Sequence, residues 1–183
     1  MNGYFLFDLR DLEPTRSLAF SPDGSLLATG HWNGTAELWD MTTHDLVFAL
    51  GGFRNAVSSF AFSADGRLLA AASFDSSIKV CDIAGKKELA TLAGHKAAVG
   101  PVAFSTDGKT LASAGDDGFI KLWNLATGRE VITFKEVVGA RFVKFSPDGR
   151  TLAAGGGSDG VVRLWRAPTL SQIEAADKVN GPQ

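Results

Sequence analysis

A glycine-rich run near the C-terminal end of the sequence is the segment closest to a catalytic motif. Residues 155–160, Gly-Gly-Gly-Ser-Asp-Gly, fit both the Gly-x-Ser-x-Gly pattern of a nucleophile elbow and the Gly-x-Gly-x-x-Gly pattern of a dinucleotide-binding loop. Both kinds of site need a helix directly after the glycines, because its N-terminus supplies the oxyanion donors or holds the pyrophosphate. The residues that follow, 161–165, read Val-Val-Arg-Leu-Trp and are typical of a strand. We therefore interpret the run as a turn between two strands.

The other residues able to do chemistry do not combine into a site. His31, His44 and His95 fall in three separate turn regions without metal-ligand spacing, and Cys81 has no partner thiol. We interpret His31 and His44 as solvated loop residues and Cys81 as a small buried apolar residue. The adjacent carboxylates Asp116-Asp117 have no nucleophile or base beside them in the sequence. The sequence therefore predicts a protein that is not an enzyme and that uses no metal or other cofactor.

Composition and charge narrow the choice of partners. The chain has 183 residues, of which 45% are hydrophobic, and its formal charge of -2 comes without any basic block. A nucleic-acid partner is not expected, because phosphate neutralisation needs clustered cations. The apolar run at residues 4–7 lacks a basic flank, and no run approaches the roughly 20 residues that cross a bilayer. With a single cysteine, these features predict a soluble, cytoplasmic protein without disulfides.

A repeat organises the chain and places many of its 21 glycines in turns. The string Phe-Ser-x-Asp-Gly occurs four times, at intervals of 42, 42 and 41 residues, beginning at Phe20, Phe62, Phe104 and Phe145. A second marker, Leu-Trp, keeps the same period at Leu38-Trp39, Leu122-Trp123 and Leu164-Trp165, and Val80-Cys81 occupies the remaining position. In the clearest copy, turn signals separate strand-like runs at 99–104, 110–114, 119–124 and 130–134. The pattern predicts an all-β protein with one four-stranded antiparallel meander in each repeat.

A unit of about 42 residues whose third strand ends in Trp-Asp or a variant of it resembles the WD repeat, the blade of a β-propeller. The resemblance covers roughly residues 4–166 and implies four blades, with repeats at approximately 11–52, 53–94, 95–135 and 136–176. The blade array as a whole is expected at about 1–170. It also implies a hydrogen-bonded tetrad within each blade. Only the third repeat matches that tetrad throughout, with His95, Ser113, Asp117 and Trp123.

The two ends of the array are compatible with either a closed or an incomplete ring of blades. Residues 4–9 lie one period before the fourth strand of repeat one, so they read as a fourth strand whose own blade is missing. This strand either completes the last blade or forms an open edge that seeks another strand. Residues 171–183 form a polar tail. Four blades can close a ring, but we favour an incomplete ring that self-associates or belongs to a longer propeller.

The residues expected to contact a partner lie on the face that the family uses for binding. Trp32, Phe74 and Asp116 occupy one position of the repeat, just before the turn acid, and Ser158 is the fourth member. The two aromatic rings either anchor a partner or fold over their own blades. Arg54, Asn55 and Lys96, in loops that enter first strands, should share this face. The expected function is a scaffold for a protein or peptide partner, and the alternative is a segment that completes a propeller with a second chain.

Overall fold

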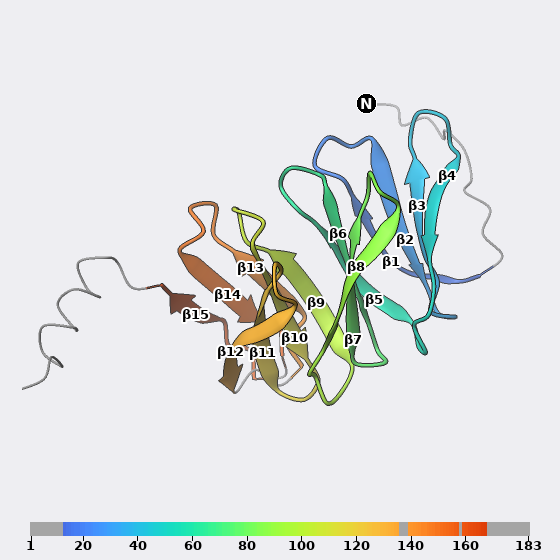
Figure 1. Cartoon of the computed structure of the whole chain (residues 1–183). Helices are drawn as coiled ribbons and strands as arrows, with labels where there is room; N and C mark the ends of the chain where they lie inside the picture. The colour runs from blue at the N-terminus through green and yellow to red at the C-terminus, as the bar shows by residue number, and fades with distance from the viewer. Residues whose placement is uncertain (1–12, 136–138, 158, 168–183) are drawn as a thin grey trace, which may run out of the picture.

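Strands are the only regular elements in residues 13–135, 139–157 and 159–167, which the computed structural model describes. They form four antiparallel sheets, called sheets 1 to 4 in chain order (Figure 1). Sheet 1 contains β1 (Thr15–Phe20), β2 (Leu26–His31), β3 (Ala36–Asp40) and β4 (Leu46–Leu50). Sheet 2 contains β5 (Val57–Phe62), β6 (Leu68–Ser73), β7 (Ser77–Asp82) and β8 (Lys87–Ala93). Sheet 3 contains β9 (Val99–Phe104), β10 (Thr110–Gly115), β11 (Phe119–Asn124) and β12 (Arg129–Lys135). Sheet 4 contains β13 (Phe142–Phe145), β14 (Thr151–Gly155) and β15 (Arg163–Arg166). The prediction of an all-β fold with one meander per repeat is confirmed.

The Phe-Ser-x-Asp-Gly string forms the turn between the first and second strands of each sheet. In sheet 3 the Ser105 hydroxyl donates to the Asp107 carboxylate at 2.6 Å and accepts the Thr110 N–H at 3.0 Å. Gly108 adopts a φ of 67°, which other residues rarely tolerate. The hydrogen bond from Ser105, with one from the Lys109 N–H, lowers the pKa of Asp107 below its usual value. The recurring string therefore codes for a locally hydrogen-bonded turn, which explains why it marks the period.

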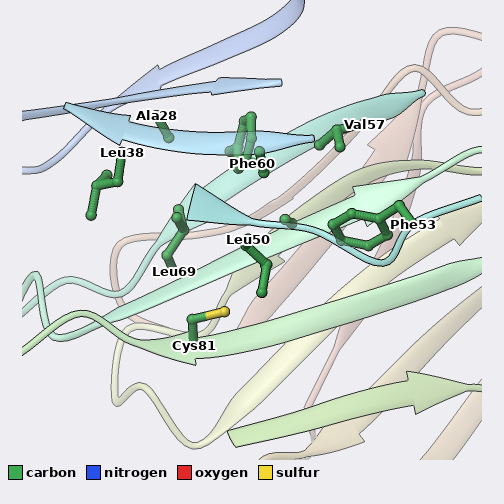
Figure 2. Close-up of a cluster of buried hydrophobic side chains, with 10 residues drawn as sticks. Ala28, Leu38, Leu50, Phe53, Val57, Phe60, Leu69 and Cys81 are labelled. Carbon is green, nitrogen blue, oxygen red and sulfur yellow. The ribbon is translucent and has the colours of Figure 1, made fainter. Parts of the chain in front are cut away.

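The core lies between the sheets. Figure 2 shows the first of three clusters, where Leu38 and Leu50 of sheet 1 point into the same space as Phe60 and Leu69 of sheet 2. The second and third clusters fill the spaces between sheets 2 and 3 and between sheets 3 and 4. First strands also pack side by side from sheet to sheet, β1 on β5, β5 on β9 and β9 on β13. Each sheet is thus stabilised mainly by its neighbours, since one sheet alone cannot bury both of its faces.

The described residues form an open arc of sheets. Sheets 1 and 4 lie at opposite ends of the row in Figure 1. Sheet 4 has three strands in the described part of the chain, whereas the other sheets have four. An apolar groove of about 520 Å³ runs between sheets 3 and 4, with Ile132, Phe134 and Trp165 in its walls. The fourth strand predicted at residues 4–9 and the tail at 171–183 lie outside the described residues.

One expectation from the sequence was wrong. His31 is not a solvated loop residue: it ends β2 and is 1% exposed. The prediction treated the residue before Trp32 as part of the turn, but β2 extends one residue further and carries the imidazole into the sheet. Gly155 ends β14, and Gly156, Gly157 and Gly160 lie between β14 and β15, so the glycine run does connect two strands.

Candidate partner-binding face

The turns between second and third strands and the loops that enter first strands meet on one face of the arc, called the loop face below. In sheets 1 to 3 a backbone hydrogen bond ties each turn to its loop: Trp32 N–H to Pro14 O at 3.2 Å, Phe74 N–H to Ala56 O at 3.0 Å and Asp116 N–H to Ala98 O at 2.8 Å. Neighbouring sheets also meet there, since a Cβ added to Gly34 would lie 2.5 Å from the Phe53 carbonyl oxygen. The loop face is therefore a connected surface, and it carries all six residues expected to contact a partner.

Two of those residues meet through a third that the sequence analysis did not select. The rings of Trp32 and Phe74 lie edge to face, with centroids 6.5 Å apart, although they come from different sheets. The Arg16 guanidinium lies over both rings, 5.7 Å from the Trp32 centroid and 5.4 Å from the Phe74 centroid. Trp32 is 53% exposed, Phe74 is half-buried and Arg16 is exposed. We call these three residues the aromatic–arginine cluster.

The cluster borders a hollow of about 440 Å³ beside the first strands of the sheets. Arg16 and Phe74 line it together with Ser58, Asp116 and Arg141. The repeat contains the signal for this lining: Arg16, Ser58, Gly100 and Arg141 are each the fourth residue before the Phe of the recurring string. The hollow is thus walled by one repeat position from four sheets, and that position carries an arginine at both ends of the arc.

Arg54, Asn55 and Lys96 lie exposed on the same face and do not line the hollow. Their loops are anchored by the turn acids, because the Arg54 N–H donates to Asp75 at 2.7 Å and the Lys96 N–H donates to Asp117 at 2.8 Å. The exposed side chains thus project from an ordered backbone. Phe74 and Asp116 line the hollow and Trp32 contacts Phe74 beside it, whereas Arg54, Asn55 and Lys96 lie in loops outside its lining.

Behind the loop face, sheet 3 contains a hydrogen-bonded chain of four side chains. The Trp123 indole N–H donates to Ser113 Oγ at 2.8 Å, and Ser113 Oγ lies 2.8 Å from His95 Nε2. His95 Nδ1 lies 3.0 Å from Asp117. Ser113 and Trp123 are buried, and His95 is 6% exposed. The chain links the third strand to the loop that carries Lys96.

Burial and hydrogen bonding fix the charges in this chain. Burial lowers the pKa of His95 and outweighs the opposing hydrogen bond and charge of Asp117, so the imidazole is neutral at neutral pH. Burial also opposes ionisation of Asp117, but hydrogen bonds from the Lys96 N–H and from His95 hold the pKa of this carboxyl below its usual value. A neutral His95 beside a carboxylate carries its proton on Nδ1 and donates it to Asp117. Its Nε2 then accepts the Ser113 hydroxyl.

Sheet 2 replaces three members of this chain together. Phe53, Ala71 and Cys81 stand in the registers of His95, Ser113 and Trp123, and all three are buried in the first core cluster. A concerted apolar replacement leaves no orphaned donor, which makes it nearly neutral for stability. Burial raises the pKa of the Cys81 thiol to about 12, so this cysteine is protonated and inert at neutral pH.

Sheet 1 builds a variant of the chain from other positions. The Trp39 indole N–H donates to Thr29 Oγ1 at 3.1 Å, and His31 Nε2 lies 3.2 Å from the same hydroxyl. The histidine here comes from the end of β2 and not from the loop before the first strand. The spacing of Thr29 and His31 could have predicted this contact, because residues two apart on a strand point to the same face of the sheet.

The described residues hold no group of His, Cys, Asp and Glu side chains that could bind a metal ion. Within those same ranges there is also no helix long and apolar enough to cross a membrane.

Comparisons with known proteins agree with this architecture. The family model "WD domain, G-beta repeat" (WD40) matches residues 13–40, 45–82, 86–124 and 131–166. Three solved structures are similar over most of the chain: "Structure of U3-55K" (23% identity, TM-score 0.78), "Crystal Structure of Mitotic Checkpoint Complex" (25%, 0.77) and "Crystal structure of RRP9 WD40 repeats" (24%, 0.74). The matches cover 87%, 84% and 87% of this chain but 50%, 49% and 50% of those chains, so this chain spans about half their length. No curated protein matches the sequence.

Proposed function

Because the chain belongs to the WD40 repeat family, whose propellers generally serve as protein-interaction scaffolds, we propose that it is a non-enzymatic scaffold that binds a protein or peptide partner on its loop face. The aromatic–arginine cluster is the observation that carries the proposal. Aromatic rings and arginine are the residue types that most often dominate binding energy at protein interfaces. Here they lie together at the rim of a hollow, which favours binding of a protruding side chain.

The cluster is already ordered without a partner. The Arg16 guanidinium is positioned by the two rings, and within the described residues it forms neither a hydrogen bond nor an ion pair. The ring contacts hold the guanidinium in place without using its five N–H donors, so a partner carboxylate can accept hydrogen bonds from two of them. Preorganisation lowers the entropic cost of binding, since fewer side chains must be immobilised.

The charges around the hollow indicate the partner's chemistry. Arg16 and Arg141 line the hollow with one carboxylate, Asp116, while Arg54 and Lys96 lie exposed in nearby loops. Cations therefore outnumber carboxylates in the lining of the hollow, although the whole chain has a formal charge of -2. The partner that fits best is an extended segment with an acidic side chain for Arg16 and an apolar side chain against the rings.

A selection from a random peptide display library tests the proposal. We expect peptides selected on the wild-type chain to be enriched in Asp and Glu, and to bind the Trp32→Ala/Phe74→Ala double variant at least ~10-fold more weakly. The matched control is Leu89→Ala, because Leu89 is 51% exposed on the outer strand β8, away from the loop face. Its affinity should equal that of the wild type, and thermal stability should change little in both variants. Equal binding of the selected peptides to the double variant would refute this assignment of the site.

The alternative function is that of a self-assembling segment that completes a propeller with a second chain. It is supported by the exposed apolar side chains Leu18 and Phe20 at one end of the arc and Leu164 at the other. Exposed apolar sheet faces of this kind favour association.

A further inference from the structure

The exposed leucine at the sheet 4 end of the arc stands in a register that is otherwise buried. Leu164 lies on the third strand of sheet 4 and is 68% exposed. In the same register, Leu38 is 1% exposed, Val80 is 2% exposed, and Leu122 packs against the third core cluster. Trp165, the next residue, stacks on Phe134 of sheet 3 with ring centroids 4.9 Å apart. Because neighbouring residues on a strand face opposite ways, Leu164 points away from sheet 3 and toward the open end.

At the sheet 1 end of the arc, apolar residues are likewise exposed in registers that are buried in the other sheets. These residues lie on the face that each of the other sheets packs against the sheet before it. Leu18 is 63% exposed, whereas its register equivalents Phe60, Val102 and Val143 are 9%, 5% and 1% exposed. Phe20 is 56% exposed, while Phe62 packs against the first core cluster. The Ser17 hydroxyl donates to the Val57 carbonyl oxygen of sheet 2 at 2.7 Å, so Ser17 faces inward. Leu18 and Phe20 accordingly face away from sheet 2.

The residues exposed at the two ends occupy the two registers that meet between neighbouring sheets inside the arc. In each core cluster, the preceding sheet contributes the residue in the register of Leu164, and the following sheet contributes the residue in the register of Leu18. Leu38 and Phe60 are such a pair, and both are labelled in Figure 2. The sheet 4 end therefore presents the surface that the sheet 1 end is shaped to cover.

We propose that two copies of this chain join head to tail, with sheet 4 of each copy packed on sheet 1 of the other, to close a ring of eight sheets. The proposal develops the alternative function and does not depend on peptide binding at the aromatic–arginine cluster. Eight blades lie within the range of closed propellers. The chain spans about half the length of the structures it matches, so two copies supply a comparable length.

The register of the first residues agrees with this arrangement. The sequence predicts that residues 4–9 form the fourth strand of a sheet preceding sheet 1. In the two-copy ring the preceding sheet is the other copy's sheet 4, which has three strands in the described residues. The strand predicted from the repeat period therefore matches the position that a sheet of three described strands leaves for a fourth.

Cations lie beside Leu164 on the outward face of sheet 4 and should weaken the contact. Lys144 and Arg166 are exposed on the outward face of sheet 4, paired across the sheet with Ala153 and Thr151. Cations beside an apolar patch keep the separated chain soluble and weaken its association. A head-to-tail contact with this character gives a concentration-dependent equilibrium between one and two chains.

The experiment measures the mass of the full chain in solution over a range of concentrations. We expect the wild type to reach twice the 19.3 kDa of one chain. Leu164→Asp and Leu18→Lys should each remain single chains, with a dimer dissociation constant raised at least ~1000-fold, because every ring buries the new charge at two contacts. The control Leu89→Asp should dimerise like the wild type, since Leu89 is 51% exposed on the outer strand of an internal sheet.

Mixing the two charged variants tests the head-to-tail geometry. One contact of the mixed dimer pairs Asp at position 164 with Lys at position 18, and the other contact is wild type, so the mixture should regain the mass of two chains. If sheet 4 packed on sheet 4, or sheet 1 on sheet 1, mixing the two variants would not bring the two opposite charges together, and the mixture would not recover the dimer. A wild-type chain that stays single at all concentrations, a mixture that fails to dimerise, or a ladder of larger species would each overturn the proposal. Peptide binding by the Leu164→Asp variant reports separately on the aromatic–arginine cluster.

Discussion

The hydroxyl of Ser113 is the most consequential single atom of the buried chain in sheet 3, and its removal tests how that chain stabilises the fold. The hydroxyl accepts the Trp123 indole N–H at 2.8 Å and lies 2.8 Å from His95 Nε2. The exposed fractions of Ser113, Trp123 and His95 are 0%, 1% and 6%, so water cannot replace the lost partner. Ser113→Ala therefore leaves one donor and one acceptor buried without partners.

The magnitude follows from the cost of orphaned polar groups. Each buried group left unsatisfied costs about 1–3 kcal/mol, so with two such groups we expect Ser113→Ala to lower the free energy of unfolding by about 2–6 kcal/mol. For a chain of this size each kcal/mol lowers the melting temperature by about 2–4 °C, so we expect a fall of roughly 4–24 °C. The assay is urea unfolding followed by circular dichroism. The slope of the free energy of unfolding against urea concentration, the m-value, should be the same in the variant and the wild type, which would show that the substitution changes stability alone.

A double-mutant cycle with Trp123→Phe separates the hydrogen bond from the loss of packing. Trp123→Phe removes the indole N–H, so in that background Ser113→Ala orphans only the His95 nitrogen. We expect the serine substitution to cost about 1–2 kcal/mol less there than in the wild type. A cost of Ser113→Ala below ~1 kcal/mol, or additive effects of the two substitutions, would refute the idea that the hydroxyl satisfies both groups.

Three further predictions concern other parts of the fold. Because burial lowers the pKa of His95 in the folded chain, the unfolded chain binds its proton more tightly, and stability should fall as pH drops through about 6.5; melting temperatures at pH 7.5 and 5.5 should differ less in His95→Asn than in the wild type. Cys81, whose thiol pKa is raised to about 12, should react with iodoacetamide only after unfolding, and rapid alkylation of the native chain would contradict its burial. Gly34→Ala should lower the free energy of unfolding in urea by at least ~2 kcal/mol more than Gly24→Ala does. Both glycines have positive φ, but only at position 34 would a Cβ meet a neighbouring backbone, so equal losses would argue against that close approach.

Much of the fold could be predicted from the sequence because its signals are local. The hydrogen bonds of the turn at Asp107 and the alternation of the strands lie within a few residues of each other, and four copies at one period make the pattern unambiguous. The registers of Trp32, Phe74 and Asp116 likewise predicted that they share a face. The burial of His31 was missed, because the end of a strand depends on its pairing partner, here Thr15 of β1, rather than on the residue's own type.

The candidate site shows the limit of this reasoning most clearly. Taken by itself, the sequence determined the repeat, the strands, the turns and the register of each side chain, because these rest on contacts within about 42 residues. Only the tertiary structure decided that Arg16 lies over Trp32 and Phe74, since these residues belong to two sheets and meet only when the sheets pack. It also decided which apolar residues are left uncovered. Leu164 and Leu38 share a register, and the difference in their exposure comes solely from whether another sheet packs against them.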